Sequence, residues 1–234
     1  MRATAYIHVP HVLHLPGAAE VRAYWAVTVG VAVLAVWMAA FYAPVDGAMG
    51  LVQKLVYVHI PAAAGALLGA GAVFGSNIAY IWTRHRVWET AAVEGARVTV
   101  FCGLVVLLTG MAWGRSAWGA WWTWSPKLTF TLILCVLYAV MIGLHSLRLP
   151  AARRAMLCAV YGAVAFIDAP LVYLSVRLLP DVHPTSVPLT GEMRVTLVTW
   201  FVLAALLCGG VLARPVVRHA RRQSLREGLG SVHA

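Results

Sequence analysis

Charge is scarce in this sequence of 234 residues. Asp, Glu, Lys and Arg together make up 11% of the chain, whereas about 25% is usual in soluble globular domains. Apolar residues reach 62%, above the roughly 45–50% of such domains. Because so few charges cannot cover a water-exposed surface, the composition excludes a soluble globule and predicts a membrane protein.

The sequence also lacks room for a separate soluble domain. A helix that crosses a bilayer needs about 20 mainly apolar residues, and six stretches meet that requirement, at roughly 23–43, 55–82, 95–113, 127–147, 155–178 and 194–213. They leave short loops, an N-terminal tail over 1–22 and a basic tail over 214–234. We therefore predict an all-α membrane domain over 23–213 with six transmembrane helices, and no catalytic, nucleotide-binding or thioredoxin-like domain.

Cysteine is rare as well, with four residues and no C-x-x-C pair. A role in thiol exchange is therefore not expected. The four lie one each in the third to sixth stretches, where a free cysteine commonly behaves as a small buried apolar residue. They are Cys102, Cys135, Cys158 and Cys208.

Acidic residues number 8 against 18 basic ones, for a net charge of +10. In a membrane protein this excess reports topology rather than a nucleic-acid partner, because cytoplasmic loops collect Lys and Arg. With the N-terminus inside, the inside segments hold twelve basic residues and the outside segments five. Both termini are therefore predicted to be cytoplasmic.

Tryptophan is concentrated in one predicted outer segment, at 111–129. Five of the ten tryptophans lie within twelve residues, more than membrane anchoring requires. Large aromatic faces favour stacking on another planar π-system, and two basic residues flank the cluster. The segment therefore fits a planar apolar ligand with acidic groups on its edge, and its candidate residues are Trp113, Trp118, Trp121, Trp122, Trp124, Arg115 and Lys127.

Two histidines share this predicted outer face. His59 begins the second apolar stretch, and His183 lies between the fifth and sixth. Imidazole is a common ligand of haem iron, and two opposed histidines can occupy both axial positions. Haem is planar, apolar and edged with carboxylates, so it fits both groups of residues. The alternative is that each histidine is a polar residue at the membrane interface.

Two polar features outside that face have two interpretations each. His8, His11 and His14 recur every three residues in the N-terminal tail, which is either loosely ordered or metal-binding. Asp168 lies within the fifth stretch, where an ionisable residue is a functional hypothesis by default. It can equally repair a helix kinked by Pro170, which leaves a carbonyl without its helical partner.

The motifs resemble a known family. WGRSAWGAWWTWSPKLT (113–129) is similar to W-G-x-x-x-W-G-x-W-W-x-W-D-x-R-L-T, the WWD signature of haem-handling proteins in cytochrome c biogenesis. YVHIPAA (57–63) and DAPLVYLSVRLLPDVH (168–183) resemble the family's two histidine segments. The chain departs from the pattern where Ser125 and Lys127 replace the signature Asp and Arg, and where Leu178 and Leu179 replace paired tryptophans.

Within that superfamily, the length and the six spans resemble the cytochrome c maturation protein C (CcmC) family. The resemblance implies a protein of the bacterial inner membrane that presents haem on the periplasmic face and transfers it to a haem chaperone. It implies non-covalent b-type haem with His59 and His183 as axial ligands, the tryptophans of 113–124 as a platform, and Arg115, Lys127 or Arg194 paired with propionates. The implied partners are the chaperone CcmE, the transporter subunits CcmA and CcmB, the small protein CcmD, and membrane lipid.

Two alternatives come from other functional classes. One is an enzyme of the same superfamily, a cytochrome c synthase that attaches haem to apocytochrome thiols. Those relatives are longer and carry further intramembrane histidines, so we expect delivery rather than catalysis. The other is a permease subunit without haem, whose tryptophan loop only docks a partner protein.

Overall fold

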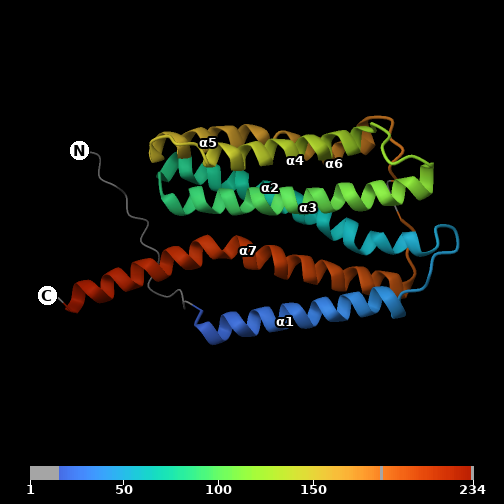
Figure 1. Ribbon diagram of the computed structural model, residues 1–234, viewed down its shortest axis with the longest axis horizontal. Coiled ribbons are helices and arrows are strands. Elements are labelled where there is room, and N and C mark those ends of the chain that lie inside the picture. Colours follow the sequence, from blue (N-terminus) through green and yellow to red (C-terminus); the bar gives the residue numbers. More distant parts are fainter. Residues whose placement is uncertain (1–15, 185–186, 233–234) are drawn as a thin grey trace.

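The computed structural model describes residues 16–184 and 187–232 and consists of helices joined by short connections (Figure 1). Two of the helices are short, a π-helical segment at the end of α1 and a 3-10 segment before α2. In chain order the elements are α1 (Ala18–Trp37), η1 (Met38–Tyr42), η2 (Leu51–Leu55), α2 (Val56–Thr83), α3 (Arg86–Trp118), α4 (Pro126–His145), α5 (Ala151–Ala165), α6 (Asp168–Leu178) and α7 (Gly191–Val232).

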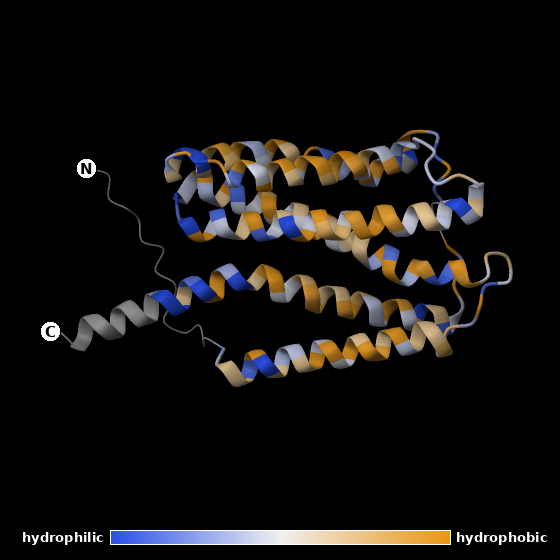
Figure 2. Cartoon of the chain, in the orientation of Figure 1, coloured by the Kyte–Doolittle hydropathy of each residue, from blue (hydrophilic) through white to orange (hydrophobic). Residues whose placement is uncertain are grey.

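The six predicted spans are confirmed. The described residues contain six helical segments that are long and apolar enough to cross a membrane, and α5 and α6 together make the fifth. Apolar residues run along the middle of these helices, whereas hydrophilic residues gather toward their ends (Figure 2). Many large apolar side chains on α1 and α7 are exposed, as expected of surfaces that face lipid rather than water.

The helices form two groups (Figure 1). Helices α2 to α6 pack on one another around a buried apolar core. Helix α7 packs against α2 and α3, and α1 lies along α7. The start of α1 and the end of α7 lie at the same end of the bundle (Figure 1).

Small residues bring α2 and α3 into close contact. A Cβ added to Gly69 on α2 would lie 2.6 Å from Thr99 Oγ1 and 3.0 Å from the carbonyl oxygen of Gly95, both on α3. No larger residue fits at this crossing. Such contacts replace the hydrophobic driving force that is missing between helices in lipid.

The fifth span is broken between α5 and α6, close to Pro170. Proline has no N–H to continue the helical ladder, and the carbonyl of Phe166 instead accepts the N–H of Ala169 at 3.1 Å. Asp168 is buried and is the first residue of α6. Asp168 Oδ2 has no hydrogen-bond partner among the described residues, and both interpretations of Asp168 stay predictions.

Two predicted features fall at the ends of the chain. His8, His11 and His14 lie outside the described residues. The basic segment from 214 onward is helical, because α7 continues without a break to Val232.

Candidate functional site

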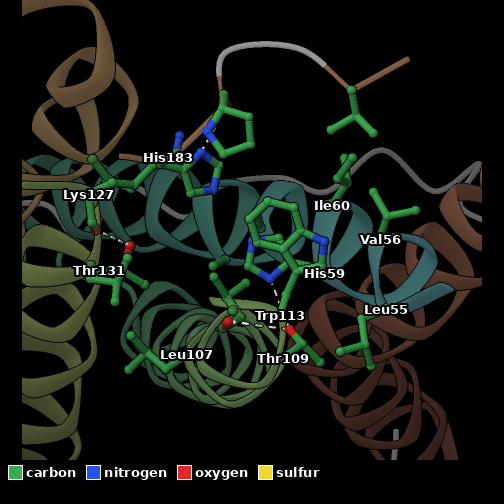
Figure 3. A pocket seen from close by; sticks show the side chains of 18 of the residues that line it. Leu55, Val56, His59, Ile60, Leu107, Thr109, Trp113, Lys127, Thr131 and His183 are labelled. Atoms are coloured by element: carbon green, nitrogen blue, oxygen red, sulfur yellow. Dashed lines mark hydrogen bonds between the residues drawn. The ribbon is translucent and has the colours of Figure 1, made fainter. Parts of the chain in front are cut away.

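Three connections meet at the end of the bundle away from the start of α1, namely 43–50, 119–125 and the described residues of the connection between α6 and α7 (179–184 and 187–190) (Figure 1). Beneath them lies a cavity of about 360 Å³, within the roughly 300–1,000 Å³ typical of small-molecule sites. Its walls are mainly apolar and come from α2, α3, α4, α6 and the adjoining connections. His59, His183 and Lys127 all line it (Figure 3).

His59 is the fourth residue of α2, and its orientation is set by α3. Its Nδ1 lies 2.9 Å from Thr109 Oγ1 (Figure 3). The threonine hydroxyl gives its only proton to the carbonyl of Val105 at 2.6 Å, so it accepts from the imidazole. Nδ1 therefore carries the proton, and Nε2 keeps a free lone pair. Gly110 makes room for the ring, because a Cβ there would lie 3.1 Å from His59 Cε1.

His183 lies in the connection between α6 and α7 and has the same tautomer. Its Nδ1 is 2.9 Å from the carbonyl oxygen of Pro184, which can only accept, so Nδ1 donates and Nε2 is free. Burial lowers the pKa of His183 below its usual 6.5, and the charge of Lys127 lowers it further. The Pro184 hydrogen bond and the Asp181 carboxylate raise that pKa by less. The neutral imidazole is therefore favoured at pH 7.

The two imidazoles face one another across the cavity. Their ring centroids are 6.2 Å apart and their planes differ by 29°. One ring comes from α2 and the other from a connection more than a hundred residues later. Imidazole is a common metal ligand, so these two histidines are the candidate ligand pair of the cavity.

Two of the predicted tryptophans also line the cavity. Trp113 and Trp118 lie on the last turns of α3, with ring centroids 5.4 Å apart and an edge-to-face angle of 82°. Trp113 Nε1 donates to the buried side chain of Gln53 at 3.3 Å. This bond fixes the plane of the indole beside His59 (Figure 3).

Four predicted residues of the tryptophan segment lie outside the cavity lining, namely Trp121, Trp122, Trp124 and Arg115. Helix α3 continues to Trp118, beyond the expected end of the span at 113, and stops at Gly119 with φ 74°, a common helix terminator. The chain then turns away. Trp121 and Trp124 are 57% and 72% exposed, Trp122 and Trp124 border a shallow apolar groove between α3 and α4, and Arg115 donates to the carbonyl of Gly119.

Arg194 is also outside the lining. It lies in the first turn of α7 and donates through Nε to the carbonyl of Leu189 at 3.2 Å. Lys127 is thus the one charged residue among the described residues that line the cavity.

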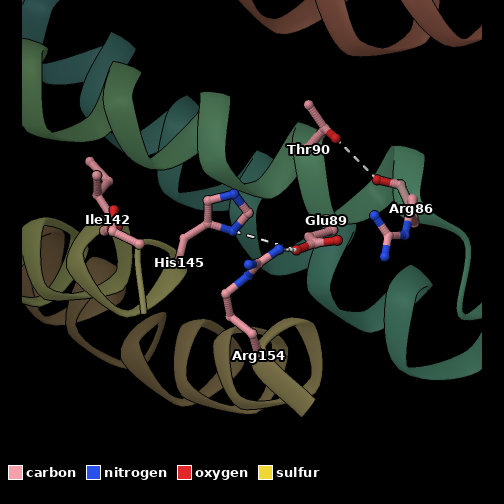
Figure 4. Close-up of polar contacts among 7 residues, drawn as sticks. Arg86, Glu89, Thr90, Ile142, His145 and Arg154 are labelled. Atoms are coloured by element: carbon pink, nitrogen blue, oxygen red, sulfur yellow. Dashed lines mark hydrogen bonds and ion pairs between the residues drawn. The ribbon is translucent and has the colours of Figure 1, made fainter. Parts of the chain in front are cut away.

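His145, at the other end of the bundle, has a different environment. His145 Nδ1 lies 3.5 Å from Glu89 Oε1, which Arg154 also contacts at 3.4 Å (Figure 4). These contacts join α3, α4 and α5 at the end opposite the cavity. Because the imidazole is engaged by a carboxylate, this cluster is a helix-to-helix contact rather than a paired ligand set.

Sequence reasoning missed several residues of the site. Thr109 orients His59, Gln53 fixes Trp113, and Asp181 accepts the N–H of His183 at 2.8 Å. Thr109 could have been proposed from the sequence, because it is a polar residue within the apolar span 95–113. No sequence signal linked Asp181 to His183 beyond their proximity.

Comparison with known proteins places the chain in a family. The family model described as "Heme exporter protein C", CcmC, matches residues 4–227. The chain belongs to the CcmC family. The resemblance of the tryptophan and histidine motifs to this family is thereby confirmed.

Members of the CcmC family from several bacteria are similar to this chain. "Heme exporter protein C" of Escherichia coli K12 is 31% identical over 168 residues, which cover 69% of this chain and 67% of that protein. The Rhodobacter capsulatus protein of the same name is 37% identical over 98 residues, or 42% of this chain and 40% of that protein. The Paracoccus denitrificans protein is 36% identical over 103 residues, or 44% and 42%.

Proposed function

We propose that this protein binds haem in the cavity between His59 and His183 and delivers it to an acceptor. The observation that carries the proposal is the pair of facing imidazoles, whose tautomers leave both Nε2 atoms free. The family is named for haem export, so haem is the cargo that such a donor set would take.

The spacing of the rings suits one iron between them. Metal–imidazole bonds are about 2 Å long, so two opposed axial nitrogens lie about 4 Å apart. Each ring centroid lies one ring radius farther out, which brings the expected separation close to the 6.2 Å between these rings. Binding through two nitrogens needs no covalent bond to the porphyrin, so we propose non-covalent b-type haem.

The remaining lining supplies the other contacts. Trp113 and Trp118 offer aromatic surface, and the deeper walls are apolar, as the porphyrin ring requires. Lys127 provides a positive charge for a propionate. Trp121 and Trp124 are exposed beside the cavity, and we propose that they contact the acceptor during transfer rather than bound haem.

The charge distribution supports an external site. The end of the bundle opposite the cavity carries most of the arginines, in the connections before α3 and α5 and at the end of α7. Since basic residues favour the cytoplasmic side, the cavity end faces the periplasm if the protein lies in a bacterial inner membrane. The acceptor would then be a periplasmic haem chaperone of the CcmE type, with CcmA, CcmB and CcmD as membrane partners.

Delivery is favoured over catalysis. The family is named as an exporter, and attachment of haem to a cytochrome would require a second set of groups to bind the thiols. A permease subunit without haem does not account for two matched imidazole tautomers in one cavity.

An absorption spectrum of the detergent-purified protein, oxidised and reduced, tests the proposal. We expect a six-coordinate b-type spectrum that His59→Ala and His183→Ala each weaken and shift toward a five-coordinate form. His219→Ala, at the far end of α7, is the matched control and should leave the spectrum unchanged. Absence of haem in the purified protein, even after haem is supplied during expression, would refute the proposal and favour the docking subunit.

A further inference from the structure

The carboxylate of Asp181 joins helix α4 to the connection between α6 and α7, which carries His183. Asp181 Oδ1 accepts the backbone N–H of His183 at 2.8 Å, and Oδ2 accepts the backbone N–H of Lys127 at 2.8 Å. Lys127 is the second residue of α4. The two oxygens of a single side chain therefore fix the distance between the His183 backbone and the start of α4.

The start of α4 depends on this distant side chain. The first N–H groups of a helix have no helical partner and are usually capped by the residue just before it. Here that residue is Ser125, whose side chain makes no cap hydrogen bond, and whose buried Oγ has no partner among the described residues. Asp181 supplies the missing acceptor, 54 residues away in sequence. A carboxylate is also the favoured charge at this end of a helix.

Between Leu179 and Pro184 the connection makes few hydrogen bonds to the rest of the bundle, whereas farther along Val187 and Leu189 pack against the apolar cluster that includes Tyr57 and Met193. Residues 180–184 form no helix, and the His183 imidazole bonds only to its neighbour Pro184 in the hydrogen bonds described for it. Among the described residues from Leu179 to Pro184, the Asp181–Lys127 bond is the one hydrogen bond that reaches a different helix. Asp181 is therefore the polar link between the His183 backbone and α4.

We propose that Asp181 is a positioning residue, which holds His183 at the spacing from His59 that allows both to ligate one haem iron. The inference rests on the proposed function, since it assigns Asp181 to the His183 ligand. The residue contacts neither the iron nor the porphyrin in this role. It acts through the backbone of His183, as outer-shell partners of metal ligands do.

The test separates positioning from simple helix capping. Apoprotein of each variant is titrated with hemin, and the spin state is read from the absorption spectrum. We expect Asp181→Ala to bind hemin about 10- to 100-fold more weakly and to give the five-coordinate spectrum of His183→Ala. Added imidazole should restore a six-coordinate spectrum in both, because it replaces the displaced ring.

Three further variants control for folding. Asp181→Asn preserves side-chain size but has one acceptor oxygen instead of two, so it should lie between the wild type and Asp181→Ala. The double variant Ser125→Asp with Asp181→Ala returns a local cap to α4 without a bond to His183. It should recover thermal stability but not the six-coordinate spectrum. Asp46→Ala removes a carboxylate that also accepts two backbone N–H groups at this end, at 2.9 and 2.7 Å, and should leave the spectrum unchanged.

Two results would overturn the inference. If Asp181→Ala keeps the wild-type spectrum while His183→Ala loses it, the carboxylate does not position the ligand, and the proposed function stands. If the double variant recovers both stability and spectrum, Asp181 is only a helix cap. A wild-type spectrum in His183→Ala would instead refute the axial role itself, and this inference with it.

Discussion

Replacing Thr109 by valine should weaken haem binding without disturbing the fold. Valine has nearly the same shape, but it cannot accept the proton that His59 Nδ1 donates at 2.9 Å. In the empty cavity the imidazole is free to rotate toward another acceptor. When Nε2 is bound to iron the ring is fixed, and Nδ1–H loses the hydroxyl that accepts its proton.

The expected magnitude follows from the loss of the hydrogen bond between His59 and Thr109. A buried donor without an acceptor costs about 1–3 kcal/mol. Loss of an outer-shell hydrogen bond to a metal-bound histidine typically lowers metal affinity about 10- to 100-fold, which corresponds to about 1.4–2.7 kcal/mol. The two estimates of the loss in binding free energy for Thr109→Val therefore overlap.

The assay is a hemin titration of purified apoprotein, followed by absorbance. Thr109→Ser retains the hydroxyl and should bind as the wild type does. The matched control is Thr131→Val, because Thr131 lines the same cavity and bonds its own helix through Lys127 O at 2.7 Å, without a hydrogen bond to either histidine. Equal affinities for Thr109→Val and Thr131→Val would refute the orientation argument.

Three further predictions concern pH, packing and topology. Burial lowers the pKa of His183 below 6.5, and iron bound at Nε2 would also compete with protons, so a six-coordinate spectrum should persist as the pH falls below 6.5. An absorbance titration with a midpoint at or above 6.5 would contradict this. Gly69→Ala should destabilise the protein by about 1–3 kcal/mol through overpacking, whereas Gly71→Ala, with no atom within 4 Å of the new Cβ, should not; thermal unfolding in detergent compares the two. Tags on both termini should resist protease added outside the cell, and a cleavage site inserted in 43–50 should be cut; the reverse pattern would invert the topology.

Hydropathy was sufficient to predict the six spans but not the lengths of their helices. The span expected over 95–113 is part of a helix from Arg86 to Trp118, because its end is set by the left-handed conformation of Gly119 rather than by the edge of an apolar run. For that reason Trp113 and Trp118 are helical residues facing the cavity, while the tryptophans after Gly119 lie outside it.

The two histidines could be predicted because each is a polar residue in a distinctive motif on one predicted face. Their partners could not. The bond from His59 to Thr109 depends on the crossing of α2 and α3, and the bond from Asp181 to Lys127 depends on how a connection folds over α4. Such contacts join residues 50 or more positions apart, and no local periodicity reports them.

The pairing of α1 with α7 has a consequence for biosynthesis. Tyr24 donates to the carbonyl of Leu206, and Trp200 donates to that of Ala35, so the polar partners of the first helix are made 165 to 182 residues later. At about 5–20 residues per second, the ribosome needs about 10 to 40 s to supply them. Helix α1 is thus made well before its partner, and the walls of the cavity on α2, α3, α4 and α6 are synthesised before α7 supplies the polar contacts of α1.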